Sequence, residues 1–226
     1  MIDRSILHCD NHLLVVNKDA GLPSVPDESG DESLFDLARA WVEDEFRKPG
    51  RAFLAIVHRL DRPVSGVLCF GRTSKGASRL SEQFRDRTTR KVYWGVVLGE
   101  PREDSGVVDH HLFKDRTRNV VSVVPEGSED AKRARTSWRV LQRREGKALL
   151  ELEPHTGRSH QLRVACRALG TPIAGDLKYG APEALPDRSI ALHARRLEIL
   201  HPTTREELAF EARLPRLAVW QGWSQA

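Results

Sequence analysis

Short apolar runs and alternating apolar and polar positions predict that strands outnumber helices in this chain. The strand candidates are rich in β-branched residues or alternate in hydrophobicity. They are residues 12–16, 67–70, 92–98 and 148–153, with shorter runs at 107–108, 120–124 and 137–141. The intervening segments 114–118 and 132–135 are basic, which predicts exposed loops or hairpin tips.

Three further segments place apolar residues at helical spacing behind a capping residue. They begin after Asp31–Ser33, at Thr73 or Ser74, and near residue 161, and Gly170 ends the third. The residues expected to face inward are Leu34, Leu37 and Trp41 in the first, Ala77, Leu80 and Phe84 in the second, and Leu162, Ala165, Cys166 and Leu169 in the third. Arg79, Arg85 and Arg87 are expected to face solvent.

The order of these elements predicts an α+β fold. Strands and helices do not alternate regularly, which favours a long mixed, mainly antiparallel sheet with flanking helices. No linker rich in Gly, Ser or Pro divides the sequence, so we expect one domain over residues 1–226.

Charge is distributed unevenly along the chain. Residues 1–50 carry 5 basic and 11 acidic side chains, and residues 51–226 carry 31 and 21. Arginine outnumbers lysine by 28 to 8, and its planar fork binds phosphate in a bidentate way. A GC-rich genome produces the same arginine content, so composition alone suggests nucleic acid without establishing it.

Several classes of protein are disfavoured by the remaining composition. Three cysteines without C-x-x-C spacing predict neither a disulfide framework nor a zinc site. The nine histidines have no ligand spacing, so we expect no metal. Charged residues interrupt the N-terminal apolar stretch, and no apolar run suits a membrane helix. These features predict a cytoplasmic protein without membrane contact, and we expect a monomer.

The segment from His58 to Gly66 combines residue types that suit catalysis. It reads HRLDRPVSG, with Asp61 between Arg59 and Arg62 on the way into a buried strand. Arg59 and Asp61 share a face if the segment is extended. Taken alone, the segment also fits a surface ion-pair cluster at a turn.

The surrounding motifs make the chain resemble the RluA-type pseudouridine synthases. HRLDxxxSG is similar to the catalytic motif of that family, and five further motifs follow the family order over about residues 6–215. They are Asn17–Lys18 with Gly21, Arg90–Tyr93, Pro154–Arg163 (PHTGRSHQLR), Gly170–Asp176 (GTPIAGD), and Leu192–Ala194 with His201–Pro202.

The resemblance implies a fold, a reaction and a set of site residues. It implies the pseudouridine synthase fold with a central active-site cleft, and a first strand near residue 6 that leaves no room for an S4-type RNA-binding domain in front. It implies an isomerase that acts on ribosomal or transfer RNA without a cofactor. The implied catalytic residues are Asp61 at the glycosidic bond, Tyr93 against the base and Arg163 paired with Asp61. The implied RNA- and uridine-binding residues are Arg59, which replaces the flipped uridine, Arg62 and Leu162.

Three positions depart from the family pattern, and two alternatives remain. Asp19 replaces a usual proline, Val64 a usual threonine, and Ala165 a common histidine. These changes bear on loop geometry and RNA specificity. The alternatives are a catalytically inactive RNA-binding protein on the same scaffold and a structural or interaction domain with an arginine-rich surface.

Overall fold

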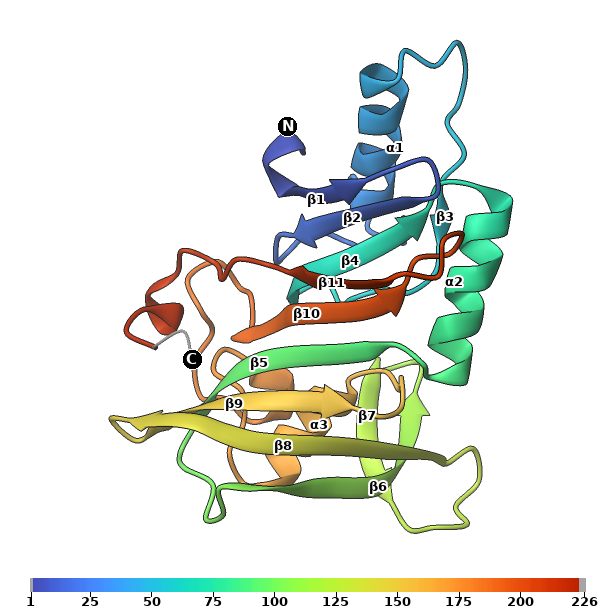
Figure 1. The fold of residues 1–226 in the computed structure, drawn as a ribbon. Helices are drawn as coiled ribbons and strands as arrows, with labels where there is room; N and C mark the ends of the chain where they lie inside the picture. The colour runs from blue at the N-terminus through green and yellow to red at the C-terminus, as the bar shows by residue number, and fades with distance from the viewer. Residues whose placement is uncertain (1, 224–226) are drawn as a thin grey trace. The chain divides into compact units, whose positions relative to one another are not determined.

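The computed structural model describes residues 2–223, whose backbone contacts divide them into two compact units. The first unit comprises the residues up to Lys91 together with Ala194–Pro215, and the second comprises Val92–His193 and the residues from Arg216 on. Both contain antiparallel strands with helices beside them (Figure 1), which confirms the α+β class and the predominance of antiparallel pairing. A single domain over residues 1–226 stays a prediction.

Four neighbouring strands build the sheet of the first unit. Their order is β1 (Ile6–Cys9), β2 (Leu13–Lys18), β4 (Ser65–Gly71) and β10 (Leu192–Leu200), with β3 (Ala55–Ile56) on β4 and β11 (Glu207–Glu211) on β10. Every residue of β4 is buried, as the uninterrupted apolar run predicts. Leu13, Val15, Val67 and Cys69 share one core cluster with Leu80.

The helices of the first unit are α1 (Leu34–Glu45) and α2 (Ser74–Asp86). Ser33 and Thr73 are their N-caps, each accepting a backbone N–H with its side chain, as predicted. The buried face of α1 differs from the prediction. It comprises Leu34, Ala38 and Val42, while Leu37 and Trp41 are half-buried at its edge. The indole N–H of Trp41 donates to Asp3, in the short 3₁₀ segment Asp3–Ser5, at 2.5 Å, which explains why that large side chain stays at the rim.

On α2, Ala77 and Leu80 are buried and Arg85 and Arg87 are exposed, as predicted. Arg79 is half-buried, and its guanidinium donates to the carbonyl of Pro202 at 2.7 Å. This bond corrects the prediction that Arg79 faces solvent, because it holds the side chain against the backbone of the His201 turn.

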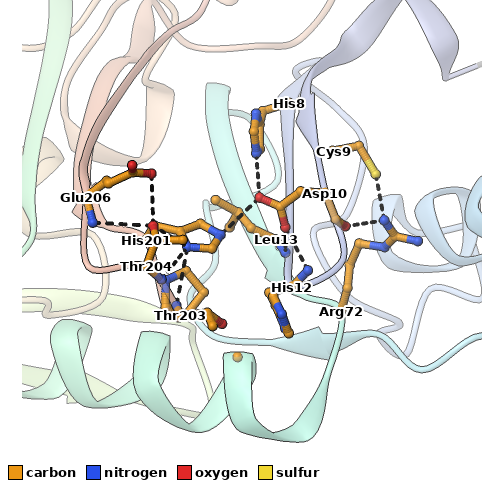
Figure 2. Close-up of polar contacts among 12 residues, drawn as sticks. His8, Cys9, Asp10, His12, Leu13, Arg72, His201, Thr203, Thr204 and Glu206 are labelled. Atoms are coloured by element: carbon orange, nitrogen blue, oxygen red, sulfur yellow. Dashed lines mark hydrogen bonds and ion pairs between the residues drawn. The ribbon is translucent and has the colours of Figure 1, made fainter.

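Asp10 joins the β1–β2 turn to the turn that follows β10 (Figure 2). Its carboxylate accepts the backbone N–H groups of His12 and Leu13 at 2.7 and 2.8 Å. It also contacts His8 Nε2 at 2.8 Å and His201 Nε2 at 3.0 Å. Burial raises the pKa of Asp10, but these hydrogen bonds and the charge of His201 outweigh burial and lower the pKa to about 2.

Five antiparallel strands build the sheet of the second unit. Their order is β5 (Arg90–Leu98), β9 (Lys147–Pro154), β8 (Lys132–Arg144), β6 (Ser105–Asp115) and β7 (Val120–Val124). Helix α3 (Gln161–Ala168) and the 3₁₀ turn Leu177–Tyr179 pack on it through Leu112, Val121, Ala134, Val164 and Tyr179. A third 3₁₀ turn spans Ala218–Trp220.

The two basic segments of the second unit have different structures. Residues 114–118 form the tip of the β6–β7 hairpin, as predicted. Residues 132–135 are not a loop. They begin β8 and pair with β6, Lys132 opposite Leu112 and Arg135 opposite Asp109. Opposite charges across the two strands, with Arg133 donating to Asp109 at 2.7 and 3.0 Å, favour this register.

Within residues 2–223, all three cysteines are free, and Cys69 and Cys166 are buried. No group of His, Cys, Asp and Glu in this range has metal-binding geometry. None of the helices described here is long and apolar enough to cross a membrane.

The low pKa of Asp10 predicts acid lability of the turns that it joins. A carboxyl whose folded-state pKa lies below its unfolded value of 3.8 stabilises the fold above that pH, and the contribution is lost as pH falls towards about 2. Asp10→Asn keeps the acceptor for the backbone N–H groups and removes the charge. We expect it to lower the free energy of unfolding by up to about 1 kcal/mol at neutral pH.

Urea unfolding of wild type and Asp10→Asn between neutral pH and pH 2 measures this effect. The two curves should converge as pH falls through this window. The exposed Asp86→Asn is the matched control and should run parallel to wild type. A constant difference between wild type and Asp10→Asn at every pH contradicts the assignment.

Candidate active site

Asp61 lies in the segment that connects β3 to β4. The backbone carbonyl of Asp61 accepts the N–H of Val64 at 3.0 Å, which closes a turn before β4 begins. Arg59 and Arg62 are exposed, Leu60 is buried, and Asp61 is half-buried between them. The first unit therefore presents a half-buried carboxylate between two exposed arginines, and the expectation that Arg59 and Asp61 share a face stays a prediction.

Lys18 holds this segment in place through hydrogen bonds to backbone carbonyls. It ends β2 with a fully buried side chain, and its ammonium donates to the carbonyls of Leu22, Asp19 and Arg62 at 2.7, 2.9 and 3.2 Å. Three carbonyl acceptors use all three ammonium hydrogens. The bond to Arg62 lies one residue from Asp61, so the buried lysine helps to determine the position of the turn that contains Asp61.

Residues 21–24 bind the same turn through the backbone. The Gly21 N–H donates to the Arg62 carbonyl at 2.8 Å, and Arg62 Nε donates back to the Gly21 carbonyl at 2.9 Å. Ser24 donates to the Leu60 carbonyl at 2.7 Å and accepts the Leu60 N–H at 3.1 Å. The turn containing Asp61 is thus bonded on both sides to the loop after β2.

Lys18 and Asp61 also interact electrostatically. Burial lowers the pKa of Lys18 to about 7, although the charges of Asp19 and Asp61 raise it. Sequence reasoning placed Lys18 in a family motif without giving it a function.

His58, at the start of the motif, is held by packing. Its ring stacks on Phe84 of α2 with centroids 4.3 Å apart, and Nε2 accepts the Cys69 N–H at 3.0 Å. Burial and the nearby Lys91 lower the pKa of His58 to about 3, so the ring stays neutral and remains an acceptor.

The backbone around Gly66 explains why the motif ends in a glycine. It has φ of +117°, and a Cβ there would lie 2.3 Å from the carbonyl oxygen of Ala194 in β10. Only glycine permits both the conformation and the close approach.

In the second unit, Arg163 is a buried cation on α3. Its Nε and Nη2 donate to the two carboxylate oxygens of Asp176 at 2.7 and 2.6 Å. The exposed fractions of the two side chains are 7% and 0%. Arg163 is therefore a buried cation that pairs with Asp176 inside the second unit.

Tyr179 completes the surroundings of Arg163. The guanidinium carbon lies 4.9 Å from the centre of the Tyr179 ring. The Tyr179 hydroxyl accepts the Val121 N–H at 2.9 Å and hydrogen-bonds with His160 Nδ1 at 2.7 Å. Gln161 bonds to Thr156, Arg158, Arg135 and Thr136, which anchors the N-terminus of α3.

The other expected site residues of the second unit are Tyr93 and Leu162. Tyr93 is half-buried in β5 opposite Leu152 of β9. Leu162 is buried in the first turn of α3. The expected pairing of Arg163 with Asp61 would join the two units and stays a prediction.

Sequence reasoning missed four residues that support the site: Lys18, Ser24, Asp176 and Tyr179. Lys18 and Asp176 lie inside motifs that the sequence analysis identified. The signal that could have indicated their role was a charged residue at a buried position next to a second charged residue. Nothing in the spacing of Ser24 and Tyr179 marked them, because their partners are distant in sequence.

Comparison with known proteins agrees with this geometry. The family model described as RNA pseudouridylate synthase matches residues 12–168. The dual-specificity RNA pseudouridine synthase RluA of Haemophilus influenzae is 38% identical over 213 residues, 92% of each chain. RluA of Escherichia coli K12 is also 38% identical, covering 92% of this chain and 91% of its own.

Among solved structures, human RNA pseudouridylate synthase domain containing 4 superposes with a TM-score of 0.80 at 30% identity, over 95% of this chain and 90% of its own. Human RNA pseudouridylate synthase domain containing 1 gives 0.73 at 29% identity, over 94% and 84%. The chain therefore belongs to the RNA pseudouridylate synthases of the RluA type, the isomerases that convert uridine to pseudouridine in RNA.

Proposed function

We propose that this enzyme isomerises specific uridines in ribosomal or transfer RNA and that Asp61 is its catalytic carboxylate. The observation that carries the proposal is the fixation of the Asp61 turn by buried Lys18, with Asp61 left half-exposed between two exposed arginines. A preorganised carboxylate at an accessible surface suits attack on a sugar carbon. The similar RluA enzymes are named dual-specificity synthases, which supports both RNA classes.

The reaction breaks the C1′–N1 and C5–H bonds of uridine and forms C1′–C5 and N1–H bonds. Asp61 acts at the glycosidic junction while the bond between C1′ and N1 breaks. The detached uracil then turns and bonds to C1′ through C5, N1 takes a proton, and C5 loses one. All atoms of the product come from the substrate, so the proposal includes neither a cofactor nor a metal.

The neighbouring residues take supporting parts in this proposal. Arg59 is exposed and enters the RNA stack in place of the flipped uridine. Tyr93 stacks on the target base and helps to remove the C5 proton, and Leu162 packs against that base. Arg62 binds Asp31 and Ser29 as well as Gly21, so its contribution to RNA binding is made from a fixed position.

Arg163 is the second buried cation of the proposed site. A partly buried carboxylate is stabilised by an opposite charge beside it. Asp176 fixes the guanidinium plane with two hydrogen bonds, and we propose that Arg163 also pairs with Asp61. The proposal places the reaction in a reducing cytosol, supported by three unpaired thiols in the described chain.

Asp61→Asn is expected to abolish pseudouridine formation and leave RNA binding intact. The substitution keeps the size of the side chain and removes its charge, so the nucleophile or base is lost. Release of tritium from RNA labelled at uridine C5 measures the reaction, and anisotropy of a labelled RNA measures binding. The exposed Glu28→Gln is the matched control and should retain full activity.

Turnover above background in Asp61→Asn contradicts the catalytic assignment. A wild-type protein that binds RNA without turnover supports the inactive RNA-binding alternative. Absence of both activities in wild type supports the structural alternative.

Separating Arg163 from Asp176 is expected to destabilise the second unit. Arg163→Met removes the guanidinium that faces the fully buried Asp176 carboxylate, and Asp176→Leu removes both carboxylate acceptors of the buried Arg163 guanidinium. Each should lower the free energy of unfolding by about 3–5 kcal/mol. The double variant should cost much less than the sum, because neither charge is then left without its partner.

Urea unfolding of the four proteins in this cycle gives the coupling energy. Additive effects contradict the buried pair. The double variant should lose less stability than the sum of the two single effects. It should still lack turnover, because the proposed cation beside Asp61 is gone.

A further inference from the structure

A basic pocket lies in the second unit and includes none of the proposed catalytic residues. It lies among the β6–β7 hairpin, the first residue of β8 and the loop before α3, and its volume is about 580 Å³. This volume falls within the range of about 300–1,000 Å³ that is typical of ligand sites. Lys114, Arg116, Lys132 and Arg158 line it, with Asp130 as the single acidic residue.

The four cations of this pocket differ from several arginines of the neighbouring strands in the same unit. Arg133 and Arg135 pair with Asp109, Arg139 with Glu151, and Arg143 with Asp104. By contrast, no ion pair within residues 2–223 involves any of the four lining cations. Lys114 has a 3.5 Å contact with Ser159, and Arg158 Nε donates to the Arg133 carbonyl at 3.1 Å. Their charges are therefore available to an anion.

The pocket also offers an apolar surface beside these charges. Phe113 lines it and is 38% exposed, while Leu112 and Val121 are buried at its base. An exposed aromatic ring among phosphate-binding cations is the combination that holds single-stranded nucleic acid, because the ring stacks on a base and the cations bind the backbone.

The pocket shares two elements with the proposed active site. Arg158 and Ser159 lie in the loop that leads into α3, where the Arg158 N–H donates to Gln161. The N–H of Val121 donates to Tyr179, whose ring lies against Arg163. RNA bound in the pocket would therefore lie next to α3, the helix that carries Arg163.

We propose that this pocket binds one nucleotide of the RNA strand outside the target uridine. The four cations hold its phosphate and Phe113 stacks on its base. This inference rests on the proposed function, since it takes RNA as the ligand.

Arg116→Ala/Lys132→Ala tests the pocket, and Arg133→Ala/Arg135→Ala is the matched control. Both double variants remove two positive charges from exposed positions in or beside β8, but the control residues are paired with Asp109. The probe is a fluorescein-labelled RNA stem-loop with a uridine-containing loop, titrated by anisotropy over a series of salt concentrations.

The pocket variant should reduce the slope of log affinity against log salt by about 1.4, which is two contacts at about 0.7 each on a single strand. The control should change the slope much less. Phe113→Ala should weaken binding roughly fivefold or more with no change in slope. Arg116→Lys/Lys132→Arg should restore the slope, because it keeps both charges.

Equal slopes for the pocket and control variants overturn the proposal. Loss of inorganic-phosphate binding without a change in the RNA slope also overturns it, since the pocket would then take a small anion. Binding is measured independently of turnover, so a wild-type enzyme without activity contradicts the proposed function and leaves this test valid.

Discussion

The energetic cost of a buried charge governs how this protein builds its site. Arg163, Asp176 and Lys18 are all buried, and each must find partners inside the fold. Arg163 and Asp176 satisfy each other through two short hydrogen bonds. Lys18 instead donates to three carbonyls, one of them in the turn of Asp61. The position of the turn that contains Asp61 depends on this hydrogen bond.

The two buried cations therefore differ in chemistry. Burial lowers the pKa of Lys18 to about 7, although the charges of Asp19 and Asp61 raise it, so its charge responds to pH near neutrality. Arg163 keeps its charge throughout this range, and its planar fork is fixed by Asp176 and the Tyr179 ring. We infer that Lys18 positions backbone while Arg163 supplies a permanent charge. A lysine at position 163 would supply neither the fork nor the same ring contact.

The sequence predicts the elements well where local signals decide them. The all-buried strand β4, the caps Ser33 and Thr73, and the end of α3 at Gly170 follow from apolar runs, hydroxyl side chains and glycine. The prediction fails where a partner that is distant in sequence determines the position of a side chain. Trp41 bonds to Asp3, Arg79 binds the Pro202 carbonyl, and Arg133 meets Asp109 across strands. Asp176 lies in a motif that the sequence analysis identified, but the sequence did not indicate that it pairs with Arg163.

The central claim is that Asp61 acts at the glycosidic bond beside Arg163. A crystal structure of the enzyme bound to uridine-containing RNA tests it most directly. The account predicts a carboxylate oxygen of Asp61 about 3–3.5 Å from C1′ of a flipped uridine. It also predicts an Arg163 nitrogen within about 3.2 Å of the other oxygen. A flipped uridine whose C1′ faces a different carboxylate, with Asp61 remote from it, would contradict the account.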